Sequence, residues 1–150
     1  MAEENNIHIK NKKASFEYSF IEKYVAGLQL TGTEIKSIRE GKANLNDAFC
    51  TFINEELWVK NMHISEYTSG THYNHEPKRD RKLLLKKNEL YRLSEKLKDQ
   101  GLTIIPFSLF ISEKGWAKLE IALAKGKKIY DKREDIKRKD TERELKRKLK

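Results

Sequence analysis

The chain has 150 residues and a formal net charge of +9, from 32 Lys and Arg against 23 Asp and Glu. Its length favours one folded domain, and its charge favours a polyanionic partner such as nucleic acid, an acidic membrane or an acidic protein. No apolar run approaches the roughly 20 residues that span a bilayer, and residues 1–13 contain no apolar stretch typical of a secretory signal, so we expect a cytoplasmic protein outside the membrane.

Residues 24–41 predict a strand followed by a short helix. From Tyr24 to Leu30, apolar side chains recur at every second position and therefore share one face, as in a β-strand. Thr31 and Glu34 have the spacing of a capping box, and Gly41 can end the helix in the left-handed conformation.

A β-hairpin is predicted between residues 45 and 64. Its first strand contains apolar or β-branched residues that alternate with more polar ones: Leu45, Phe49, Thr51 and Ile53. The second strand is expected at residues 57–64, after a turn at residues 54–56.

A polar loop at residues 65–82 is expected to separate this hairpin from a second helix. Asn88 is placed to cap that helix, and Gly101 to end it. Three apolar side chains share one helical face: Leu90, Leu93 and Leu97.

Two further strands are predicted at residues 103–111 and 116–124. The first directs four apolar residues to one side: Ile105, Phe107, Leu109 and Ile111. Pro106 requires an edge or a bulge, because proline cannot donate a ladder hydrogen bond. In the second strand, Lys118 points outward while four apolar residues point inward: Ala117, Leu119, Ile121 and Leu123. The order of elements predicts a mainly β fold, a small antiparallel barrel of the OB type with two or three short helices.

Composition divides the chain into a barrel domain, residues 1–125, and a basic C-terminal tail, residues 126–150. Residues 125–150 contain 13 Lys or Arg against 6 Asp or Glu, a charge of +7, which leaves +2 for residues 1–124. The tail has few apolar residues to bury, so we expect it to be disordered when free. Acid-before-base pairs four residues apart, such as Glu134 and Arg138, can support a helix once a polyanionic partner binds.

No motif in the sequence supports catalysis or metal binding. Cys50 is the only cysteine, and we expect it to be a small buried apolar residue. His72 and His75 are spaced as HxxH but lack further ligands at zinc spacing. The sequence also contains no nucleophile elbow, P-loop or dinucleotide-binding motif. We therefore expect no enzymatic activity, no cofactor and no metal.

Basic residues interleaved with aromatic ones are the positive signal for nucleic acid. Lys and Arg neutralise phosphates and release counterions, while exposed aromatic rings can stack on unpaired bases. Residues 78–82 supply four bases close to Tyr67 and Tyr73. A solvated basic loop is the alternative, and Trp116 and Tyr130 are equally compatible with packing roles.

Four ordered segments resemble the signature blocks of one family. They are residues 31–39, TGTEIKSIR; 41–44, GKAN; 75–85, HEPKRDRKLLL; and 124–133, AKGKKIYDKR. In order and spacing they resemble small protein B, the SsrA-binding protein family, from about residue 10 to the end.

The resemblance implies an OB-fold domain that binds the tRNA-like domain of transfer-messenger RNA and carries it to stalled ribosomes for trans-translation. It further implies that the tail enters the vacant decoding centre and mRNA channel and becomes helical there. The implied partners are transfer-messenger RNA and the ribosome, and we expect a monomer.

Residue by residue, the resemblance assigns RNA contacts to the first helix and its following turn, to the basic segment and to one strand lysine. These candidates are Lys36, Arg39, Lys42, Asn44, Arg79, Arg81, Lys82, Leu84 and Lys118. In the tail it assigns contacts in the ribosomal decoding centre to Lys127, Lys128, Tyr130, Asp131, Lys132 and Arg133. Val25 departs from the pattern, because many members carry an acidic residue there, and an RNA contact by that carboxylate cannot be carried over.

Two other classes of function remain open from the residues alone. A structural or assembly rRNA-binding protein would share the charge pattern without preferring a tRNA-like elbow. An RNA-modifying enzyme would need a catalytic constellation that the sequence does not display.

Overall fold

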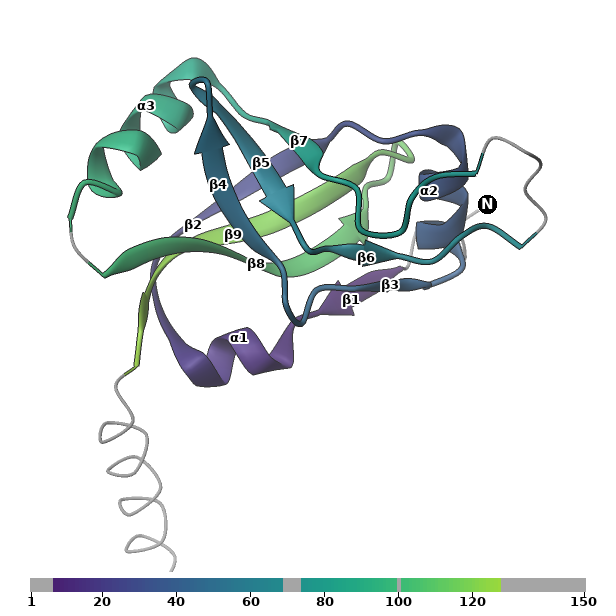
Figure 1. The fold of residues 1–150 in the computed structure, drawn as a ribbon, viewed down its shortest axis with the longest axis horizontal. Coiled ribbons are helices and arrows are strands. Elements are labelled where there is room, and N and C mark those ends of the chain that lie inside the picture. The colour runs from purple at the N-terminus through teal and green to yellow at the C-terminus, as the bar shows by residue number, and fades with distance from the viewer. Residues whose placement is uncertain (1–6, 69–73, 100, 128–150) are drawn as a thin grey trace, which may run out of the picture.

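The computed structural model describes residues 7–68, 74–99 and 101–127 (Figure 1). The strands are β1 His8–Lys10, β2 Tyr18–Leu28, β3 Ala43–Asn44, β4 Phe49–Ile53, β5 Glu56–Lys60, β6 His63–Ile64, β7 Arg81–Leu84, β8 Leu102–Ile111 and β9 Ala117–Gly126. The helices are α1 Lys12–Glu17, α2 Gly32–Arg39 and α3 Lys87–Lys96. The mainly β fold with short helices is therefore confirmed.

Antiparallel pairing closes most of the strands into a ring. The large sheet has the order β1-β8-β4-β5-β7-β2-β9, and β8 also pairs with β9. Strand β8 thus pairs with β9 along one edge. Along its other edge it pairs first with β4, at Ile104, and further on with β1, at residues 108–110. Closure satisfies backbone groups that would otherwise lie at open sheet edges.

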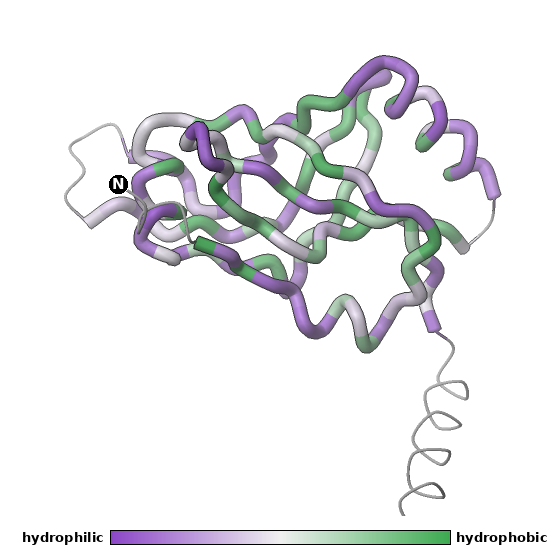
Figure 2. The backbone as a smooth tube through the Cα atoms, turned by 180° about the vertical axis from the view of Figure 1, so that it is seen from behind, coloured by the Kyte–Doolittle hydropathy of each residue, from purple (hydrophilic) through white to green (hydrophobic). Residues whose placement is uncertain are grey.

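The interior of the ring holds the main hydrophobic core. Figure 2 shows apolar and polar segments alternating along the strands. Strand β9 follows its predicted phase, with Leu119 and Ile121 fully buried. In β4 the buried side chain is Cys50, whereas Phe49 and Ile53 are exposed. Burial raises the pKa of the Cys50 thiol, in keeping with the prediction of a small buried apolar residue.

Pro106 lies at a β-bulge, as its missing donor requires. The register of β8 on β9 shifts between Pro106 and Ser108. The bulge changes which face of the strand points inward: Leu109 and Ile111 belong to the main core, whereas Ile105 packs in a second, smaller cluster. The expectation that all the apolar residues of this strand share one side was therefore wrong.

Several boundaries differ from the sequence-based expectations. Strand β1, helix α1 and the first part of β2 lie within residues 8–23, where no element was predicted, and β7 begins at the end of the predicted loop. Helix α3 is capped at Lys86 rather than at Asn88. Strand β7 pairs through only two residues with each neighbour, so it is too short to show a clear alternation in sequence.

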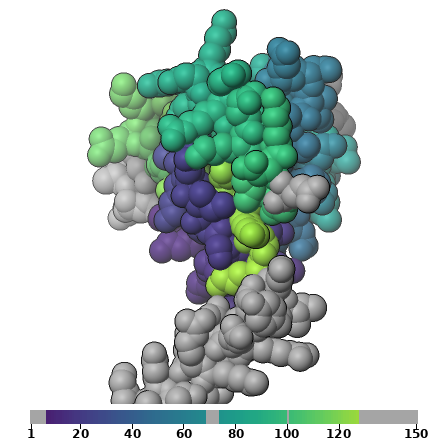
Figure 3. Space-filling view, turned by 90° about the vertical axis from the view of Figure 1, so that its left-hand side faces the viewer, coloured from purple at the N-terminus to yellow at the C-terminus, as the bar shows by residue number. Residues whose placement is uncertain are grey.

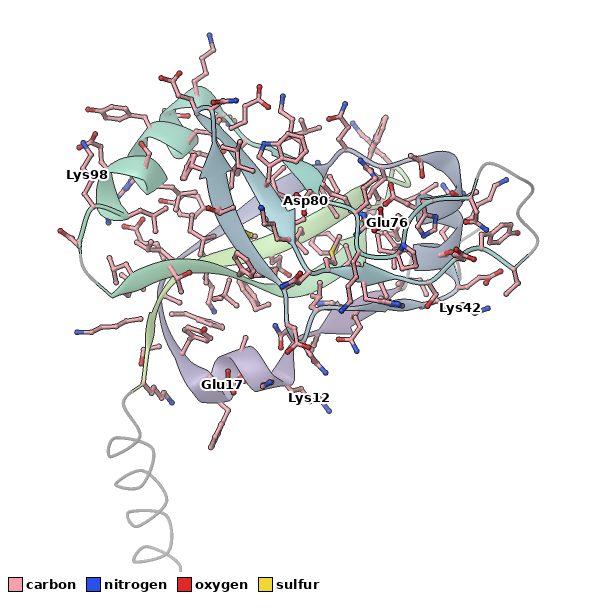
Figure 4. All side chains as sticks on the ribbon, viewed as in Figure 1. Lys12, Glu17, Lys42, Glu76, Asp80 and Lys98 are labelled. Carbon is pink, nitrogen blue, oxygen red and sulfur yellow. The ribbon has the colours of Figure 1, made fainter. Side chains whose placement is uncertain are left out.

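Helix α3 covers one end of the ring. Figure 3 shows it above β2 and the end of β9. The carboxylate of Glu22 in β2 accepts hydrogen bonds from Lys96 and from Arg92, the latter with an N–O distance of 3.3 Å. These contacts attach the helix to the sheet at the end of the molecule opposite Lys42 (Figure 4).

Candidate nucleic-acid interface

Helix α2 and the turn after it present four of the predicted contact residues. Gly41 has a φ of 75° and ends the helix as predicted. Lys36 and Arg39 are exposed in the last turn, where the helix dipole favours positive charge. Lys42 and Asn44 are also exposed, and Figure 4 shows Lys42 at the edge of the molecule.

Three of these side chains are cations, and each lies close to another group of the protein. Lys36 Nζ lies 5.6 Å from the centroid of the Tyr67 ring. Lys42 Nζ lies 3.1 Å from a carboxylate oxygen of Glu40. The Arg39 guanidinium lies beside the β8–β9 turn, where a Cβ added to Gly115 would be 3.8 Å from Nη2. Helix α2 is thereby next to the start of β9.

A second set of predicted residues lies on the outward face of β7, β2 and β9. Lys118 of β9 is opposite Gly27 of β2, which in turn is opposite Leu84 of β7. Residues directly opposite in an antiparallel ladder point to the same side, so these three share a face. Lys82 lies on that face two residues before Leu84. The Leu84 side chain is 51% exposed, close to Gly27, where an added Cβ would be 3.3 Å from the Leu84 Cβ.

The β8–β9 turn joins the two sets into one surface. Lys118 follows Gly115 by three residues, which is about 10 Å of extended strand. Trp116 lies between them and is 66% exposed, which makes an aromatic ring available beside the cations. We call this the α2/β9 surface and define it by Lys36, Arg39, Lys42, Asn44, Lys82, Leu84, Trp116 and Lys118.

Arg81 does not belong to this surface. Its side chain is 0% exposed, and its Nε donates a hydrogen bond to the equally buried carboxylate of Glu34. Its Nη1 donates to the Met62 carbonyl at 2.6 Å and its Nη2 to the Pro77 carbonyl at 3.1 Å. This burial argues against the predicted direct contact of Arg81 with RNA, because the guanidinium connects α2, the segment before β6 and the loop before β7.

Glu34 is the centre of this buried network. Arg79 Nη2 lies 2.6 Å from Glu34 Oε1, and the Arg79 side chain remains 37% exposed, so it stays accessible to a ligand. Burial by itself would raise the pKa of Glu34. Hydrogen bonds from Arg79, from the Thr31 N–H and from Arg81 outweigh that effect and lower the pKa to about 2.

The network makes stability depend on pH in the acid range. Because the folded-state pKa of Glu34 lies below the ordinary 4.5, ionised Glu34 stabilises the fold above pH 4.5, and this contribution is lost as the pH falls toward about 2. We expect the urea midpoint to decrease over this interval. A Glu34→Leu/Arg81→Met variant should show a smaller decrease over the same interval, and an equal decrease in both proteins would contradict this role.

Both ring nitrogens of His75 have hydrogen-bond partners within the protein. Its ring is buried, with Nδ1 2.9 Å from Thr33 Oγ1 and Nε2 2.9 Å from the Ile64 carbonyl oxygen. His72, its HxxH partner, lies outside the described residues. Within the described ranges, no group of three or more His, Cys, Asp or Glu side chains is placed to hold a metal ion. None of the described helices is long and apolar enough to cross a membrane.

A third group of polar and aromatic residues lies along β1 and the start of α1. His8, Lys10 and Lys12 line a pocket of about 290 Å³ together with Phe107 and Glu120. Figure 4 labels Lys12 at the start of α1. The sequence did not single these residues out, because β1 has only three residues and shows no clear pattern. Phe107 and Glu120, which line the same pocket, are about 100 residues away in the sequence.

Val25 stands where many members of the family carry an acidic residue, and it lies in the ladder between β2 and β9. Val25 is exposed and lies directly opposite Glu120 in the ladder. The Glu120 carboxylate of β9 is therefore next to the position in β2 where this chain has valine instead of an acidic residue.

The tail is described only up to Lys127. The Lys127 N–H donates a hydrogen bond to the Glu17 carbonyl at 2.9 Å, beside the last ladder pair of β9. The other predicted tail contacts lie outside the described residues: Lys128, Tyr130, Asp131, Lys132 and Arg133.

Comparisons with known proteins agree over almost the whole chain. A family model described as "SmpB protein" matches residues 8–150. The "SsrA-binding protein" of Cytophaga hutchinsonii is 63% identical over 142 residues, which are 95% of this chain and 93% of the relative. That of Phocaeicola vulgatus is 62% identical over 144 residues, 96% of each chain. A solved structure described as "tmRNA-SmpB: a journey to the center of the bacterial ribosome" matches with a TM-score of 0.71 and 40% identity, over 87% of this chain and 94% of that one.

Proposed function

Because the chain belongs to the SmpB protein family, we propose that it binds the tRNA-like domain of SsrA RNA, also called transfer-messenger RNA, and delivers it to stalled ribosomes for trans-translation. The observation that carries this proposal is the family match over residues 8–150, with relatives named SsrA-binding protein that align over nearly their full length. The protein acts by binding RNA and catalyses no reaction. It works as a monomer in the cytoplasm, where ribosomes translate.

The α2/β9 surface is suited to folded RNA. Exposed Lys36 and Arg39 and half-buried Lys118 can neutralise phosphates, while Trp116 and Leu84 offer apolar area to an unstacked base or a sugar. Arg79 adds a half-exposed guanidinium that Glu34 already orients. Sequence-independent phosphate contacts supply affinity, and the shape of the strand face supplies preference for a folded ligand.

The tail is proposed to occupy the vacant decoding centre and mRNA channel of the small subunit. The family match includes the tail, and its basic composition suits rRNA. The candidate contact residues are Lys127, Lys128, Tyr130, Asp131, Lys132 and Arg133.

The proposal is tested by competition in gel-shift titrations. The full chain should bind labelled transfer-messenger RNA, and unlabelled ordinary tRNA should compete less well than unlabelled transfer-messenger RNA. Equal competition by rRNA fragments of the same length would instead favour a structural or assembly role on rRNA.

Lys118 is expected to contribute a phosphate contact. The Lys118→Ala variant should weaken binding to transfer-messenger RNA and reduce the slope of log affinity against log salt by about 1. Lys98→Ala is the matched control, because it removes the same charge at the far end of the molecule (Figure 4). Equal salt slopes for Lys118→Ala and the parent chain would exclude Lys118 from the interface.

A further inference from the structure

The pocket at β1 and α1 has the size of a site for one flat ring system. Its volume of about 290 Å³ is just below the range for small-molecule pockets, which begins near 300 Å³. Its walls come from β1, α1, β2, β8 and β9, so residues far apart in the sequence define its shape.

One wall of the pocket is aromatic. The rings of Phe20 and Phe107 lie with centroids 5.2 Å apart and an interplanar angle of 34°. Both are only half buried, and Lys23 Nζ lies 5.4 Å from the Phe107 centroid. Phe20 packs against the smaller hydrophobic cluster, but the accessible area of the two rings also offers a surface against which an unpaired base can stack.

The Glu120 side chain, a carboxylate, also lines the pocket. Within the described part of the chain, the ion-pair partner of Glu120 is His8, whose Nε2 lies 4.0 Å from Oε1. His8 Nε2 is also hydrogen-bonded to Ser108 Oγ. An ionised carboxylate accepts hydrogen bonds and cannot donate them, so it repels phosphate and favours a ligand that presents N–H or O–H donors.

Three lysines lie in or beside the pocket. Lys10 and Lys12 line the pocket and are exposed, and Lys23 lies beside it. Glu120 also shares the outward face of β9 with Lys118, about 7 Å along the strand. One RNA molecule bound at Lys118 can therefore place a neighbouring nucleotide in the pocket, with its phosphate on the lysines and its base toward Glu120.

On the basis of the proposed function, we propose that this pocket holds an unpaired guanine of the bound RNA and that Glu120 determines the choice of base. Guanine presents N1–H and the N2 amino group side by side, and these two donors match the two oxygens of one carboxylate. Adenine and cytosine present a single amino group, and uracil a single N–H, at the corresponding edge. Single-stranded RNA is commonly recognised through such edges together with aromatic stacking.

Nucleotide titrations of the ¹⁵N-labelled full chain test this site. Guanosine 5′-monophosphate should shift the amide signals of His8, Lys10 and Ser108, and should bind at least about fivefold more tightly than the adenosine, cytidine or uridine monophosphates. Glu120→Gln should abolish that preference, because an amide offers one acceptor oxygen in place of two. Glu95→Gln on α3 removes the same charge away from the pocket and should keep the preference.

Equal affinity for the four nucleotides, or a guanine preference that survives Glu120→Gln, overturns the proposal. A gel shift of the unmodified chain separates this outcome from failure of the proposed function. Binding of transfer-messenger RNA without guanine preference rejects the pocket alone. Guanine preference without binding of transfer-messenger RNA rejects the proposed function alone.

Discussion

Glu34→Ala is expected to lower the free energy of unfolding by about 3–5 kcal/mol, because it leaves Arg81 as a buried cation without its counterion. Domains of this kind have total stabilities of about 5–15 kcal/mol, so the variant should be close to unfolding. Urea titration followed by circular dichroism measures the change. Arg79 adds little to this figure, because its guanidinium is partly solvated.

Two further variants give this prediction its controls. Glu95→Ala removes an exposed carboxylate that pairs with Lys98, and it should change stability by no more than about 0.5 kcal/mol. Glu34→Leu/Arg81→Met replaces both buried charges by apolar groups and should recover much of the loss. If the double variant is as unstable as Glu34→Ala, the isolated charge is not the cause.

The double variant also separates a structural role of Arg81 from an RNA-binding one. Arg81 is fully buried, and its guanidinium donates to protein oxygens. A folded double variant should therefore lose no more affinity for transfer-messenger RNA than Arg79→Ala does, because loss of Glu34 also removes the group that orients Arg79. A loss of affinity clearly larger than that of Arg79→Ala, with retained folding, would place Arg81 in the interface.

Deletion of residues 128–150 is expected to abolish tagging on stalled ribosomes while the remaining chain folds and binds transfer-messenger RNA. Strand β9 is complete at Gly126, which pairs with Tyr18, and the Lys127 N–H still reaches Glu17. The deletion removes 11 Lys or Arg and 6 Asp or Glu, so the net charge falls from +9 to +4. Circular dichroism, gel shift and a reconstituted tagging assay measure the three properties.

A tail of the same composition in scrambled order is the control for charge alone. It should bind ribosomes through electrostatics but should not support tagging, because the order of residues from Lys128 to Arg133 is altered. Full tagging by the scrambled chain would show that charge is sufficient. Loss of folding or of free RNA binding in the deletion would contradict the proposed division into a folded β domain and a separate tail.

Short-range patterns in the sequence predicted several elements correctly. The spacing of Thr31 and Glu34 predicted the start of α2, and Gly41 predicted its end. The turn predicted at residues 54–56 lies at residues 54–55 and joins β4 to β5, with positive φ at Asn54 and Glu55. Pro106 predicted a bulge. Each of these features depends on conformations and hydrogen bonds within a few residues, which the local sequence determines.

The tertiary structure alone decided which charged residues face the solvent and which are buried. Arg81 and its neighbour Lys82 are both basic, yet β7 directs one into the core and the other outward. The partner of Arg81 is 47 residues away in sequence, and Glu120 reaches His8 only because β9, β8 and β1 lie side by side. Such pairings are set by the closure of the strand ring and its registers, and they depend on contacts between distant segments that no local spacing encodes.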